Sequence, residues 1–135
     1  MSLKNSMLSM FRAKKVVQTV EQELYTPLGL RSLSPKNSQY QGIYIGDPYK
    51  RDSAYHQGTV WAWLMGAFIT SLERTYPKGR KYKQYIDKIL KGFEAHLSDE
   101  GIGQISEIFD GDKPHEPRGC FAQAWSIAEI LRVIK

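Results

Sequence analysis

The stretch from Val60 to Ile69 carries an apolar side chain at nearly every position. A helix without a polar face has to be buried on all sides, so this stretch restricts what the chain can fold into. Thr59 directly precedes it and is a suitable N-cap, and Pro77 and Gly79 mark its end. We therefore expect a buried helix from Thr59 to about Tyr76.

Three other segments have helical periodicity. Residues 7–25 and 80–97 are amphipathic, with an apolar stripe opposite charged side chains, whereas residues 120–135 are apolar on most sides. The order along the chain is thus amphipathic, buried, amphipathic, buried. This alternation predicts an all-α fold of about four helices in alternating outer and inner layers.

Short connections make successive helices antiparallel, so the two inner helices should be parallel and open at the same end. Two polar clusters, Tyr55–Thr59 and Glu107–Arg118, immediately precede their N-termini. We expect these clusters to share one site. Two outer helices cannot cover two buried ones on every side. The pattern therefore requires more helix pairs than the chain contains. Self-association or a larger helical domain would supply them.

The segment between Gly103 and Gly119 holds four carboxylates, a histidine and an arginine among glycines and prolines that prevent a helix. Such loops on a packed scaffold often carry binding or catalytic groups, although a solvated acidic turn has the same composition. Residues 104–109 are expected to include a short extended piece. The connection from Pro27 to Ser53 is long, and its tyrosines favour order over disorder.

Composition excludes several classes of function. At 135 residues the chain is one domain at most, and its charge of +5 is spread out rather than gathered in a nucleic-acid motif. No apolar run reaches the roughly 18 residues that a membrane span needs. The single cysteine, Cys120, excludes an internal disulfide, and the N-terminus lacks a signal-peptide core. We expect a cytoplasmic protein that binds neither nucleic acid nor membrane.

Three motifs together resemble the glycogen debranching enzymes of the amylo-α-1,6-glucosidase type. The C-terminal signature is GQISEIFDGDKPHEPRGCFAQAWSIAE (residues 103–129), the inner-helix motif is YHQGTVWAWL (55–64), and the loop before it is GLRSL (29–33). The family usually has proline where this chain has Ala62, and asparagine is common at the position of Gln57.

The resemblance implies an (α/α)6 toroid, of which residues 1–135 would form a C-terminal fragment of about four helices. It also implies hydrolysis, with inversion, of the α-1,6-linked glucose at a glycogen branch stub. Such a reaction needs a general acid and a general base. Glu107 matches the family's general base. The general acid is expected upstream of these residues, so the chain alone is expected to be inactive.

The remaining site residues follow from the same motifs. Candidates for contacts to sugar hydroxyls or to the sugar face are Tyr55, His56, Trp61, Asp110 and Arg118. On a helix Trp61 and Trp63 would lie about 200° apart, so at most one would face the site. Trp125 is expected in the core, and Cys120 is expected to be buried and inert.

No metal and no cofactor are expected, because the three histidines lack metal-ligand spacing and no nucleotide fingerprint is present. The expected partner is a branched α-glucan, either glycogen or a limit dextrin. Two alternatives stay open. One is a fragment of another glucosidase or trehalase-like toroid. The other is a module that binds glucan or self-associates without catalysis.

Overall fold

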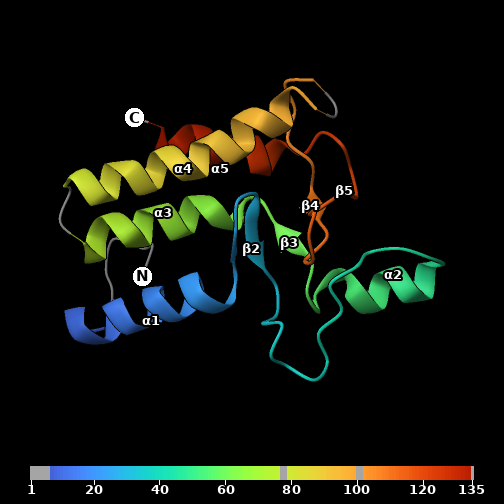
Figure 1. Cartoon of the computed structure of the whole chain (residues 1–135), viewed down its shortest axis with the longest axis horizontal. Coiled ribbons are helices and arrows are strands. Elements are labelled where there is room, and N and C mark those ends of the chain that lie inside the picture. The colour runs from blue at the N-terminus through green and yellow to red at the C-terminus, as the bar shows by residue number, and fades with distance from the viewer. Residues whose placement is uncertain (1–6, 77–78, 100–101, 135) are drawn as a thin grey trace.

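A computed structural model describes residues 7–76, 79–99 and 102–134. Within these ranges the chain forms five helices and five short strands, in the order α1-β1-β2-α2-β3-α3-α4-β4-β5-α5 (Figure 1). The helices are α1 (Met10–Glu23), α2 (Pro48–Tyr55), α3 (Leu64–Thr75), α4 (Arg80–Leu97) and α5 (Ala124–Val133). The strands are β1 (Tyr25–Thr26), β2 (Gly29–Arg31), β3 (Val60–Trp61), β4 (Ile108–Phe109) and β5 (Pro117–Arg118).

The all-α prediction is wrong in part, because the strands form one antiparallel sheet in the order β1-β2-β3-β4-β5. The apolar run that was expected to be entirely helical begins as the central strand. Leu30 of β2 pairs with Trp61, and Val60 pairs with Phe109 of β4. A short apolar run cannot be assigned to strand or helix from periodicity alone, and here tertiary pairing decides for strand.

The expected helix boundaries shift for the same reason. Thr59 is not an N-cap: it is buried, and its hydroxyl donates to the Tyr55 carbonyl, while α3 begins at Leu64 after Trp63. The last helix begins at Ala124 rather than Cys120. The long connection from Pro27 contains β2 and the extra helix α2, which Asp47 caps by accepting from the Lys50 amide at 2.9 Å.

The predicted directions of the four longer helices are confirmed. Figure 1 shows α3 and α5 running from the sheet toward the far end, whereas α1 and α4 run back toward it. α3 lies in the centre and contacts α1, α4 and α5. Its inward side chains form the core together with residues of the sheet and α4, including Met65, Phe68, Ile69, Ile89, Phe93 and Phe109.

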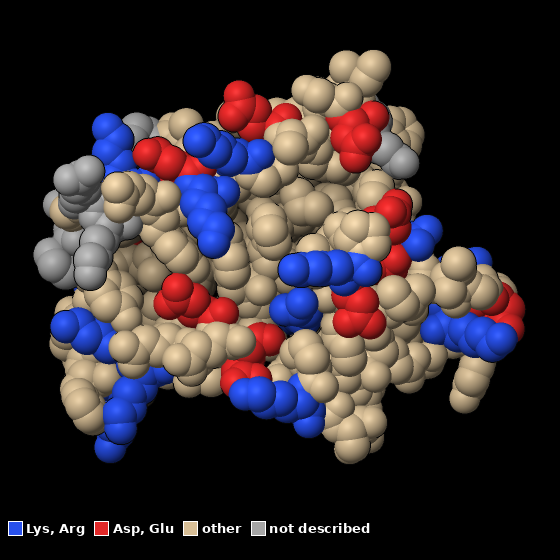
Figure 2. Space-filling model, viewed as in Figure 1, with Lys and Arg blue, Asp and Glu red and all other residues tan. Residues whose placement is uncertain are grey.

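α5 does not have the cover that was predicted for an inner helix. It buries Ser126 and Ile130, whereas Trp125 and Leu131 are exposed. In the part of the chain that the structure describes, no helix is long and apolar enough to cross a membrane. On the face in Figure 2, acidic and basic side chains are interspersed rather than separated into single-sign areas.

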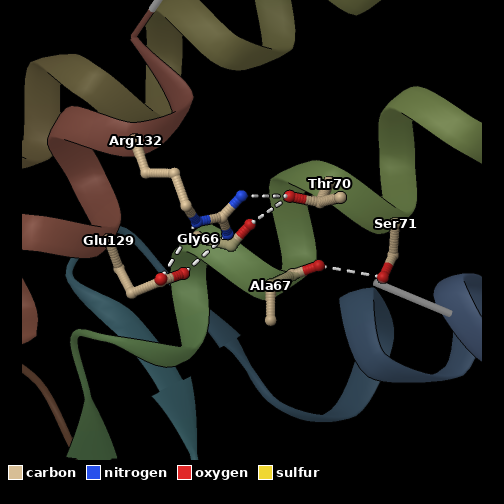
Figure 3. Close-up of polar contacts among 6 residues, drawn as sticks. All are labelled: Gly66, Ala67, Thr70, Ser71, Glu129 and Arg132. Carbon is tan, nitrogen blue, oxygen red and sulfur yellow. Dashed lines mark hydrogen bonds and ion pairs between the residues drawn. The ribbon is translucent and has the colours of Figure 1, made fainter. Parts of the chain in front are cut away.

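Gly66 allows α3 and α5 to approach closely. A Cβ atom at Gly66 would lie 2.2 Å from the Glu129 carboxylate and 2.9 Å from the Glu129 carbonyl oxygen. Figure 3 shows Arg132 of α5 reaching both Glu129 and Thr70. The Arg132 guanidinium donates to the Glu129 oxygens at 2.6 and 2.9 Å and to the Thr70 hydroxyl at 3.1 Å. The two parallel helices are therefore joined by close packing and by a polar link.

We predict that Gly66→Ala lowers the free energy of unfolding by about 1–2 kcal/mol, because overpacking outweighs the better helix propensity of alanine. Chemical denaturation measures the change. Ala128→Ser on the exposed side of α5 is the control and should change stability by less than about 0.5 kcal/mol. An alanine variant as stable as the parent sequence would contradict the close approach.

Candidate functional site

The site lies where the sheet meets the N-terminal ends of α3 and α5 (Figure 1). Tyr55 ends α2, Trp61 lies on β3, and Glu107 directly precedes β4. The structure brings together the two polar clusters that the sequence predicted to share a site, because the Tyr55 hydroxyl donates a hydrogen bond to Glu107.

Both oxygens of the Glu107 carboxylate accept hydrogen bonds from the protein. The Tyr55 hydroxyl donates to Oε1, and the backbone N–H of Cys120 donates to Oε2 at 3.0 Å. The backbone N–H of Glu107 donates to the Cys120 carbonyl at 2.8 Å. Each carboxylate oxygen has a second acceptor position, so Glu107 is held firmly and can still accept a hydrogen bond from a water molecule or a sugar.

Tyr55 is placed to act as a donor. Burial, followed by the hydrogen bond to Glu107 and the negative charge of Glu107, raises the pKa of the Tyr55 hydroxyl well above its ordinary value. The phenol therefore stays protonated across the physiological pH range. Its proton is therefore available to the Glu107 carboxylate throughout that range.

Aromatic rings surround Tyr55. The Trp61 and His56 rings are stacked, with centroids 5.3 Å apart and planes inclined by 7°, and Trp61 meets the Tyr55 ring edge-on at 4.8 Å. The Trp61 indole N–H donates to the Tyr55 carbonyl at 3.2 Å. These contacts fix the orientation of the Tyr55 ring and, through its hydroxyl, that of Glu107.

A cavity of about 1050 Å³ opens beside this cluster. Its walls combine aromatic rings with a few polar groups, which suits a ligand that has an apolar face and hydroxyl edges. The lining residues are Ser32, Tyr55, His56, Trp61, Trp63, Leu64, Ala67, Trp125, Glu129 and Arg132.

Two predictions about tryptophans are wrong. Trp61 lies on a strand rather than a helix, so the 200° separation does not apply, and Trp61 and Trp63 line the same cavity. Trp125 is not in the core: it is 49% exposed and lines that cavity too. The sequence could not reveal this, because exposure of α5 depends on which helices the fold places beside it.

Asp110 and Arg118 form a pair behind the site. Asp110 is 2% exposed, and its Oδ2 accepts from the Arg118 guanidinium at 2.8 and 3.1 Å. Its Oδ1 accepts the backbone N–H of Tyr44 at 2.8 Å. Because the Asp110 side chain is almost completely buried, this geometry favours a role for Asp110 in positioning the chain over a direct contact with a sugar hydroxyl.

Further contacts tie the acidic loop to the segment around Tyr40. The Arg31 guanidinium, which had no predicted role, donates to the Gly111 carbonyl at 2.9 Å, and the Tyr40 hydroxyl donates to Asp112 at 3.0 Å. His115 is buried, with Nδ1 2.9 Å from the Asp110 carbonyl oxygen. The loop is thus anchored from several sides and is not a solvated acidic turn.

Sequence reasoning missed the part played by Gly119 and Cys120. Cys120, expected to be buried, is exposed, and its backbone rather than its thiol contacts Glu107. Gly119 has φ of +68°, and a Cβ atom there would lie 2.6 Å from Glu107 Oε2. Among the described residues, no group of three or more His, Cys, Asp or Glu side chains could hold a metal ion.

We predict that Gly119→Ala destabilises the chain more than Gly103→Ala does. Both glycines have positive φ, at +68° and +80°, so the backbone strain of about 1 kcal/mol is common to both. A Cβ atom at Gly103 would have no neighbour within 4 Å, whereas a Cβ atom at Gly119 would clash with the Glu107 carboxylate and displace it. Denaturation of the two variants measures the difference, and equal losses would argue against crowding at Glu107.

Comparisons with known proteins agree with the motifs. A family model described as amylo-alpha-1,6-glucosidase matches residues 1–132. The glycogen debranching enzyme of Saccharomyces cerevisiae (strain ATCC 204508 / S288c) is 25% identical over 139 residues. That alignment covers 88% of this chain and 9% of the yeast protein, so the chain spans less than a tenth of this relative.

Proposed function

The chain belongs to the amylo-α-1,6-glucosidase family, and we propose that it carries the general base and part of the glucose pocket of a debranching glucosidase. The whole enzyme would hydrolyse the α-1,6-linked glucose at the branch stub of glycogen or a limit dextrin, with inversion. Residues 1–135 would be a C-terminal piece of an (α/α)6 toroid. The cytoplasmic location expected from the sequence stays a prediction.

The observation that carries the proposal is the arrangement around Glu107. A general base has to hold a water molecule against the anomeric carbon and take its proton as the bond to the leaving oxygen breaks. The Tyr55 hydroxyl and the Cys120 amide each hold one oxygen of the Glu107 carboxylate and fix its direction. The aromatic cavity beside Tyr55 offers a surface for the apolar face of the sugar ring.

The general acid is proposed to come from the remainder of the enzyme. Glu129 lines the cavity, but its hydrogen bond with Arg132 lowers the pKa of the Glu129 carboxyl, so this group stays ionised and does not suit proton donation. Asp110 is buried against Arg118. A separation of about 6.5–9.5 Å between acid and base would leave room for the attacking water.

Glucan binding without turnover is the second candidate. Trp63 and Trp125 are 38% and 49% exposed, respectively, and they line the cavity together. Exposed tryptophans in one cavity can bind a sugar face without any catalytic carboxylate. Turnover that depends on Glu107 separates the two functions, because the binding function does not need this residue. Whether copies of the chain associate stays a prediction.

We predict that Glu107→Gln in a full-length debranching enzyme containing this chain lowers kcat for branch-stub hydrolysis about 10²–10⁴-fold. The amide keeps the shape of the side chain, so glucan binding should change little. Glucose release from a limit dextrin and an equilibrium binding measurement check both parts. Glu116→Gln, an exposed carboxylate in the same loop, is the control. A loss of less than a few-fold would remove Glu107 from this role.

We also predict that Tyr55→Phe lowers kcat about 10–10²-fold, because it removes a hydrogen bond to a charged group while the ring contacts with Trp61 and His56 remain. The matched control is Tyr49→Phe, since Tyr49 lies on the same helix and is exposed. The test is to measure kcat of the two variants on the same limit dextrin. Equal kcat values would show that the Tyr55 hydroxyl does not support Glu107.

A further inference from the structure

The two residues before Glu107 are anchored to two helices, α4 and α5. The Ile105 carbonyl accepts the Gln123 backbone N–H at 2.9 Å at the start of α5. The Ser106 N–H donates to Nε2 of His96 at 3.3 Å, and the Ser106 carbonyl accepts the Ser126 hydroxyl at 3.2 Å. The backbone that precedes Glu107 is therefore held by residues that are not part of the cavity lining.

His96 is built into this position. It lies in the last turn of α4 and is buried, and its ring meets the Phe109 ring edge-on at 4.9 Å. Because a backbone N–H can only donate, Nε2 has to be the unprotonated nitrogen and the neutral ring has to carry its proton on Nδ1. Phe109 belongs to β4, so His96 contacts the strand both before and after Glu107.

Ser106 and Ser126 are completely buried as well. A buried backbone group without a partner is unfavourable, so losing either contact would make the strand move or admit water. The Glu107 carboxylate has to meet Tyr55 on one side and the Cys120 amide on the other. A displacement of Ser106 would be passed directly to these two hydrogen bonds.

We propose that His96 is a positioning residue for the Glu107 carboxylate, acting through the backbone N–H of Ser106, with Ser126 of α5 holding the carbonyl of the same residue. This inference rests on the proposed role of Glu107 as general base. A misplacement of about 1 Å at a reacting group can lower turnover about 10²-fold, so an effect on kcat is expected without direct contact between His96 and substrate.

The test compares His96→Leu with His96→Gln in a full-length debranching enzyme containing this chain. Leucine removes the acceptor, whereas the glutamine side chain can place a carbonyl oxygen near the position of Nε2. We expect His96→Leu to lower kcat about 10–10²-fold with KM changed less than about twofold, and His96→Gln to recover most of the loss. Glutamine that performs no better than leucine would overturn the proposal.

A double-mutant cycle separates positioning from a merely structural effect. If His96 acts through Glu107, then His96→Leu should lower kcat less than about twofold further once Glu107→Gln is present. The same loss in both backgrounds would overturn the proposal and leave the function of Glu107 standing. Full turnover by Glu107→Gln alone would overturn the proposed function and this inference with it.

Ser126 provides a second route in case His96→Leu does not fold. Ser126→Ala removes the donor to the Ser106 carbonyl with little change in size, whereas Ser126→Thr keeps a hydroxyl. We expect the alanine variant to lower kcat several-fold and the threonine variant to lower it less. Once Glu107→Gln is present, Ser126→Ala should lower kcat less than about twofold further. Unchanged kcat in Ser126→Ala would contradict support of Glu107 through the Ser106 peptide.

Discussion

The two-residue strand Val60–Trp61 pairs on both edges, and the rest of the molecule is arranged around this pairing. On one edge it pairs with Leu30 and Arg31 of β2, and on the other with β4, which Glu107 directly precedes. The chain then turns directly into α3, the central helix of the core. β3 is thus connected to the core helix α3 and is paired with the strand that Glu107 precedes. The position of Glu107 therefore depends on how the helices pack.

The site is assembled mainly through backbone contacts between loops. Gly111 lies so close to the neighbouring loop that a Cβ atom there would be 2.3 Å from the Gly58 carbonyl oxygen, and Gly119 brings the Cys120 amide to the Glu107 carboxylate. The buried carboxylate of Asp110 also holds the loop, because it accepts hydrogen bonds from the Tyr44 amide and the Arg118 guanidinium. Such contacts need short side chains and satisfied polar groups, which explains the abundance of glycine and aspartate in the loop.

The aromatic cavity and the exposed side of α5 have a common cause. α5 packs against α3 along one side, where Gly66 permits close approach, and its other side carries Trp125 and Leu131 in exposed positions. Apolar surface of this kind usually marks a place for a ligand or another protein surface. The proposal of a larger helical domain with a glucan in the cavity accounts for both features.

The sequence by itself determined the helical periodicity, the parallel direction of α3 and α5, and the two polar clusters that precede them. The helical periodicity follows from the spacing of side chains that are close together in the sequence. The motifs also selected Glu107, through its match to the family's general base, and Tyr55, as a candidate for contacts to sugar hydroxyls. That the Tyr55 hydroxyl donates to Glu107 is visible only in the structure. Only the tertiary structure makes Val60–Trp61 a strand and brings Trp63 and Trp125 to one cavity. It also places the Cys120 amide against Glu107, and His96 and Ser126 against the backbone of Ser106. These outcomes depend on hydrogen bonds and close contacts between residues far apart in the chain, and periodicity carries no information about such pairs.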